Sequence, residues 1–127
     1  MNPGILIIED EEHVRETIAL LLQNADYRVK ALSGGEGLYE AIDTFQPDVI
    51  LLDIILKNED GRTLCKELKS NPETSVIPIV ILSAVPEIYN TISEVGANDV
   101  ISKPFDERTL LSRIQRQLSN SASANLC

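Results

Sequence analysis

Residues 49–53 read Val-Ile-Leu-Leu-Asp, four apolar residues in succession that end on a carboxylate. An unbroken run of Val, Ile and Leu is typical of a strand buried on both faces, as in a parallel sheet covered by helices on either side. Residues 5–8 and 77–82 are nearly as apolar, and shorter or more mixed apolar runs occur at residues 27–32 and 100–101. The chain therefore has five candidate strands.

The segments between these runs have the apolar spacing of amphipathic helices. In the first of them, Val14, Ile18 and Leu21 fall on one stripe, and Asp106 is well placed to cap the last one. We expect helices around residues 14–25, 38–45, 64–68, 88–95 and 110–118. Strands that alternate with helices in this way form right-handed βαβ units, so the sequence predicts an α/β fold with a doubly wound parallel sheet.

The composition indicates one domain with a hydrophobic core and an acidic surface. The chain has 127 residues, 43% of them hydrophobic, and 20 acidic against 11 basic side chains give a formal net charge of −9. This charge argues against direct binding to nucleic acid or to an anionic membrane, both of which favour basic surfaces. No apolar run is long enough for a membrane span or a signal peptide, and two cysteines are too few for a disulfide framework. We therefore expect a cytoplasmic protein.

The end of the chain differs from the rest. Residues 119–127 are mostly Ser, Ala and Asn and have no apolar periodicity. The sequence predicts a folded domain over residues 4–118, followed by a flexible tail or the start of a linker over residues 119–127.

Chemically distinctive side chains follow four of the five apolar runs. In an open α/β sheet, ligands bind beyond the carboxyl ends of the strands. The groups found there are three carboxylates, one hydroxyl and one ammonium: Glu9, Asp10, Asp53, Ser83 and Lys103. We expect these five side chains to lie on one rim of the sheet.

Several short motifs also occur in a specific order along the chain. They are Glu9-Asp10, Asp53, Asp60-Gly61, Ser83-Ala84, Gly96-Ala97 and Lys103-Pro104-Phe105. In this order and spacing, from Gly4 to about Leu118, the chain resembles the receiver domains of two-component response regulators. The resemblance implies a flavodoxin-like sheet of five parallel strands in the order 2-1-3-4-5, with five helices.

The resemblance also implies a magnesium site. Asp10, Asp53 and the backbone carbonyl of Ile55 would bind Mg²⁺ directly. Glu9 would assist, partly through water. Hard oxygen ligands suit Mg²⁺, and grouped carboxylates raise one another's pKa unless a cation lies between them.

The chemistry implied by the same resemblance is phosphoryl transfer. Asp53 would attack the phosphorus of a phosphohistidine and become an acyl phosphate. Lys103 and the hydroxyl of Ser83 would contact the phosphoryl group, although a serine at this position also suits a helix cap. Such a domain acts as a switch and not as an enzyme, with only weak self-phosphorylation and self-dephosphorylation.

The partners implied by the resemblance are proteins. A sensor histidine kinase or a phosphotransfer protein would donate the phosphoryl group, and a downstream protein target would respond to the reshaped surface. The domain would be a monomer or a phosphorylation-dependent dimer, without direct contact to nucleic acid or membrane.

Three features depart from the family pattern. Lys57 stands where the family usually has proline, which predicts a less rigid loop after Asp53. Val100 stands where many members have a Tyr or Phe switch residue, and segment 83–96 is shorter than is typical. These last two features favour an alternative function, a receiver-like module that binds partners without phosphorylation.

A flavodoxin-like redox protein is a third hypothesis on the same strand order. It needs a phosphate-binding loop after the first strand and aromatic side chains that stack on a flavin, but only 4% of the residues are aromatic. The glycine-rich residues 33–37 follow the second candidate strand and lack dinucleotide-binding spacing, so they indicate only a helix entry. The complete set of five rim residues favours the phosphorylation switch.

Overall fold

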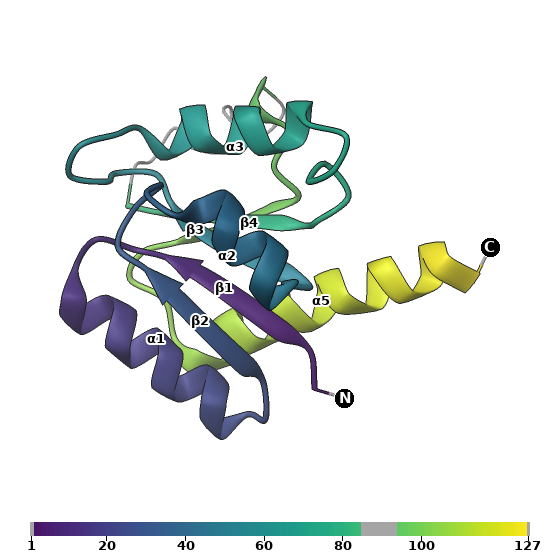
Figure 1. Ribbon diagram of the computed structural model, residues 1–127. Helices are drawn as coiled ribbons and strands as arrows, with labels where there is room; N and C mark the ends of the chain where they lie inside the picture. The colour runs from purple at the N-terminus through teal and green to yellow at the C-terminus, as the bar shows by residue number, and fades with distance from the viewer. Residues whose placement is uncertain (1, 85–93, 127) are drawn as a thin grey trace.

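Five parallel strands form a single sheet in the order β2-β1-β3-β4-β5 (Figure 1). The computed structural model describes residues 2–84 and 94–126. The strands are β1 (Gly4–Ile8), β2 (Arg28–Leu32), β3 (Val49–Asp53), β4 (Ile79–Ser83) and β5 (Asp99–Ser102). The predicted strand order and the predicted doubly wound α/β fold are confirmed.

Four helices have both ends within the described residues. They are α1 (Glu12–Asn24), α2 (Leu38–Phe45), α3 (Gly61–Ser70) and α5 (Glu107–Leu126). The fifth predicted helix, around residues 88–95, falls mainly on residues 85–93, as does most of the short segment 83–96, and residues 85–93 lie outside the described residues. None of these four helices is both long enough and apolar enough to cross a membrane.

The helices cover the two faces of the sheet in pairs, α1 with α5 and α2 with α3 (Figure 1). Along β1, Ile5 and Ile7 pack against the α1 and α5 side, whereas Leu6 and Ile8 pack against the α2 and α3 side. Every residue of β1, β3 and β4 is buried. Burial on both faces is the physical reason why these three strands are almost continuously apolar in sequence.

Helix α5 is longer than the sequence predicts. It continues to Leu126, whereas a flexible tail is predicted from residue 119, and its last turns extend past the sheet (Figure 1). The apolar periodicity that ends near residue 118 reports which side chains are buried, not where the backbone stops being helical. No Gly or Pro occurs from residue 107 to residue 126, so no strong helix breaker ends the helix earlier. The domain boundary near residue 118 stays a prediction.

Two leucines of α1 provide a matched test of the core. The side chain of Leu22 is 0% exposed and packs in the cluster beneath α1 and α5, whereas Leu20 is 59% exposed. We expect Leu22→Ala to lower the free energy of unfolding by about 2–5 kcal/mol, because it removes buried methyl groups and leaves a cavity. Leu20→Ala should change it by less than about 0.5 kcal/mol. Urea unfolding followed by circular dichroism measures both values, and equal losses would contradict the packing described above.

Candidate functional site

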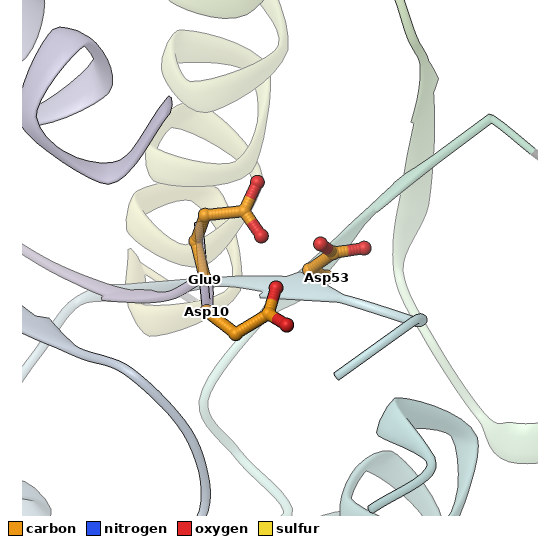
Figure 2. Close-up of side chains that lie close together, drawn as sticks. All are labelled: Glu9, Asp10 and Asp53. Atoms are coloured by element: carbon orange, nitrogen blue, oxygen red, sulfur yellow. The ribbon is translucent and has the colours of Figure 1, made fainter. Parts of the chain in front are cut away.

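Three carboxylates meet at the carboxyl end of the sheet (Figure 2). Glu9 and Asp10 follow β1, and Asp53 is the last residue of β3. Because Ile8 is paired with Leu52 in the parallel register, the residues that follow them also lie side by side. One carboxylate oxygen from each of the three acids lies within 4.8 Å of the other two. The acids predicted to share one rim are therefore together.

Lys103 lies between two of these acids. Its Nζ atom donates to Glu9 Oε1 at 2.8 Å and to Asp53 Oδ2 at 3.1 Å. The backbone places it there, because the Lys103 N–H donates to the carbonyl of Ser83 at 2.8 Å and so continues the pairing of β4 with β5. The predicted position of the ammonium at the rim is confirmed.

The charges at this rim do not balance. Glu9 is 1% exposed and Asp53 is 5% exposed, so both carboxylates have lost most of their hydration. The pKa of Glu9 is raised from 4.5 to about 7, chiefly by burial and also by the hydrogen bond and charge of Asp53, which together outweigh the lowering effect of Lys103. Burial lowers the pKa of Lys103, but its contacts with the two acids outweigh burial, and the net change is a raised pKa. Lys103 contacts two of the three carboxylates, so its one positive charge does not neutralise the cluster.

One oxygen of Glu9 indicates that the cluster suits a cation. Glu9 Oε2 is buried and has no hydrogen-bond partner among the described residues. A buried carboxylate oxygen without a donor is energetically unfavourable, because no hydrogen bond or ion pair compensates for its lost hydration. Three adjacent carboxylates and one unsatisfied oxygen fit a hard divalent cation such as Mg²⁺, which prefers oxygen ligands and keeps several waters.

The raised pKa of Glu9 predicts that the metal-free protein loses stability as the pH rises from about 5 to about 8. The folded state holds this proton more tightly than the unfolded chain, in which the pKa is 4.5. The extra stability is fully present below pH 4.5 and is lost as the pH rises through about 7, with an upper bound of about 3 kcal/mol. Urea unfolding in the presence of a chelator, at several pH values, measures the loss.

The control for this pH dependence is Glu9→Gln. Glutamine keeps the size and a hydrogen-bond acceptor but cannot titrate. The free energy of unfolding of this variant should therefore fall less over the same pH range. A fall as steep as that of the unmodified protein would contradict the assignment to Glu9.

The loop after β3 holds the Asp53 carboxylate in place. The N–H of Ile55 donates to Asp53 Oδ1 at 3.1 Å. The two ends of the loop are joined, because the N–H of Gly61 donates to the carbonyl of Ile54 at 2.8 Å and Ile55 forms an antiparallel bridge with Asp60. The side chain of Ile55 is exposed at the edge of the site.

A depression of about 310 Å³ lies over the acidic cluster. Among the predicted site residues, Glu9, Asp10, Asp53, Ile55 and Lys103 all line it. Ser83 does not line it. This serine is the last residue of β4 and is buried, and its neighbour Ala84 lines the depression instead. The role of the Ser83 hydroxyl therefore stays a prediction.

The sequence did not reveal one contributor to the site, Arg15 of α1. Its Nη1 atom donates to the carbonyl of Glu9 at 2.9 Å and to that of Asp10 at 3.3 Å. The guanidinium thereby fixes the backbone that carries both acids. The only signal in the sequence is a cation one to two helical turns after an acid pair, which is common on solvent-exposed helices.

Comparison with known proteins agrees with the geometry. The family model for the response regulator receiver domain matches residues 5–115. The DNA-binding dual master transcriptional regulator RpaA of Synechocystis sp. is 36% identical over 119 residues, which cover 91% of this chain and 49% of that protein. The chain thus spans about half the length of the curated relatives it matches.

Two solved structures are similar along most of their length. A candidate response regulator from Chloroflexus aurantiacus has a TM-score of 0.86 and 34% identity, covering 94% of this chain and 99% of that one. The receiver domain of sensor histidine kinase PA1611 from Pseudomonas aeruginosa has a TM-score of 0.83 and 26% identity, with coverage of 94% and 99%. That receiver domain is described with a magnesium ion coordinated in its active site cleft. The fold, the acidic rim and the family match together show that this chain belongs to the response regulator receiver domain family.

Proposed function

We propose that this chain is a phosphorylation-controlled switch of two-component signalling, in which Asp53 accepts a phosphoryl group with the help of Mg²⁺. The observation that carries the proposal is the convergence of Glu9, Asp10 and Asp53 beside Lys103 at one end of the sheet. In a member of the receiver family, this constellation supports a phosphoacceptor site.

The metal ligands would be the carboxylates of Asp10 and Asp53 and the backbone carbonyl of Ile55, with Glu9 assisting, partly through water. The buried, unpartnered Oε2 of Glu9 supports this placement, because a cation or its bound water would satisfy it. When bound, Mg²⁺ neutralises negative charge on the phosphoryl group during its transfer.

The chain's own residues supply the nucleophile and a second cation. A carboxylate oxygen of Asp53 attacks the phosphorus of a phosphohistidine, a P–O bond forms, the P–N bond breaks, and the leaving imidazole takes up a proton. The Ile55 N–H, at 3.1 Å from Asp53 Oδ1, keeps the carboxylate oriented for this attack. Lys103, at 3.1 Å from Oδ2, is close enough to contact the phosphoryl group once it is bound. Ser83 would donate its hydroxyl to another phosphoryl oxygen.

The proposed partners follow from the chemistry and from the relatives. The phosphodonor is a sensor histidine kinase or a phosphotransfer protein in the cytoplasm. RpaA is described as a DNA-binding transcriptional regulator, and this chain matches only about half of that protein. We infer that this receiver acts on a protein partner or an attached output domain, not on DNA itself, and that it is a switch with only weak self-phosphorylation and self-dephosphorylation.

Val100 does not by itself favour a phosphorylation-independent module. It is buried in β5, paired with Ile81 of β4, and belongs to the core on the α2 and α3 side. Valine at this position therefore packs the core, which is compatible with either function.

Intact-mass measurement tests the proposal directly. The full chain is incubated with Mg²⁺ and a small phosphodonor such as acetyl phosphate, and we expect one phosphoryl group to be added. A chelator should prevent the addition, because the carboxylates would then lack their cation. No addition in the presence of Mg²⁺ would overturn the proposal in favour of the interaction module.

A further inference from the structure

The glycine-rich turn after β2 contacts the loop after β3. The N–H of Gly35 donates to the Glu59 carboxylate. A methyl group on Gly34 would lie 2.7 Å from Glu59 Oε1, and one on Gly35 would lie 2.6 Å from Glu59 Oε2. The turn therefore has room for this carboxylate because both positions lack a side chain.

Glu59 belongs to the loop that forms one wall of the metal site. The loop's ends are joined by the hydrogen bond from Gly61 to Ile54 and by the bridge between Ile55 and Asp60. Leu56 anchors the middle of the loop in the core on the α2 and α3 side. Glu59 precedes the bridged Asp60, so its contact with Gly35 ties the exposed half of the loop to a separate part of the molecule.

We propose that Glu59 is a positioning residue, held by the Gly34-Gly35 turn, that fixes the 54–60 loop and with it Ile55 at the metal site. The inference rests on the proposed function, in which the Ile55 carbonyl binds Mg²⁺ and the Ile55 N–H orients Asp53. A loop that samples fewer conformations presents both backbone groups at a smaller entropic cost.

The composition of the loop strengthens this inference. Residues 54–60 contain no proline, so no residue in the loop has its φ fixed by a ring, and a restraint on the loop must come from its contacts. The contact between Glu59 and Gly35 is a cross-loop restraint of this kind. The glycine-rich segment, which the sequence indicated only as a helix entry, thereby acquires a second role.

A double-mutant cycle tests the restraint in the full chain. Glu59→Ala should weaken Mg²⁺ binding about three- to tenfold, the effect of losing one charge-assisted hydrogen bond that positions the site. Gly34→Ala should weaken it similarly, because its methyl group meets only Glu59 atoms within 4 Å and its φ is not positive, so it displaces the carboxylate without backbone strain. In the Glu59→Ala background, Gly34→Ala should have no further effect. Isothermal titration with Mg²⁺ gives the affinities.

Two control variants separate positioning from charge. Glu59→Gln removes the charge but keeps an oxygen that accepts from Gly35, so it should retain most of the affinity of the unmodified protein. Glu67→Ala removes a carboxylate from the exposed face of α3 and should have little effect. Amide hydrogen exchange at Gly35, measured by NMR without metal, should become faster in Glu59→Ala and stay slow in Glu59→Gln.

The outcomes distinguish this inference from the proposed function. If the unmodified protein binds no Mg²⁺, the proposed function fails first. If it binds Mg²⁺ and Glu59→Ala binds equally well, or if Glu59→Gln is as weak as Glu59→Ala, the positioning role is wrong. Additive effects of Gly34→Ala and Glu59→Ala would also refute the shared restraint.

Discussion

Replacing Asp53 by asparagine is expected to abolish phosphoryl incorporation while the fold stays intact. The amide is not a nucleophile for phosphorus at neutral pH, so incorporation from a small phosphodonor should fall by at least about a hundredfold. The fold should persist because asparagine keeps the Oδ1 acceptor that the Ile55 N–H uses at 3.1 Å. Intact mass after incubation with Mg²⁺ and the phosphodonor gives the first result, and circular dichroism gives the second.

The same substitution at an exposed aspartate is the matched control. Asp43 lies on the exposed face of α2, so Asp43→Asn should be phosphorylated like the unmodified protein. Persistent incorporation in Asp53→Asn would show that another group accepts the phosphoryl group. Asp53→Asn should also lower the pKa of Glu9, because both the hydrogen bond and the charge of Asp53 raise it.

The strands and the acidic rim could be predicted because both depend on local sequence. A strand buried on two faces must be apolar along its whole length, so β1, β3 and β4 are visible as runs of Ile, Leu and Val. Parallel strands end at the same edge, so the residue after each run is placed without any knowledge of distant contacts. Asp53 and Lys103, which are 50 positions apart, therefore come within 3.1 Å as expected.

The parts that could not be predicted depend on side chains that reach across the fold. Arg15 binds backbone carbonyls of the loop before its own helix, and Glu59 binds a glycine 24 positions earlier in the chain. Neither contact leaves a periodic or compositional signal, because a charged residue on a helix or loop usually faces water. The end of α5 is a third case, since polar Ser and Asn residues neither favour nor forbid a helix strongly enough to decide its length.

Gly61 could be predicted only in part. The family resemblance marks Asp60-Gly61 as a motif, but only the structure shows why position 61 requires a residue without a side chain. Helix α3 begins at Gly61 directly against the end of β3, and a methyl group there would fall on the carbonyl oxygen of Asp53. The same methyl group would lie 2.7 Å from the Cα of Ile54 and 3.0 Å from the carbonyl carbon of Asp53. All three neighbours are backbone atoms, so no side-chain rotation can relieve the overlap.

Gly61→Ala is therefore expected to be among the most destabilising single-methyl additions in this chain. To admit the methyl group, α3 must move away from β3, which stretches the 2.8 Å hydrogen bond from Gly61 to Ile54 and displaces the loop that orients Asp53. We expect a loss of about 2–4 kcal/mol in the free energy of unfolding, together with weaker Mg²⁺ binding and slower phosphorylation. Gly34→Ala is the control for stability alone, because its methyl group meets only the end of a flexible side chain and should change the free energy of unfolding by less than about 1 kcal/mol. If Gly61→Ala proved as stable and as readily phosphorylated as the unmodified protein, this prediction would be wrong. Close backbone packing between α3 and β3 would then not be what holds the loop after β3 in place.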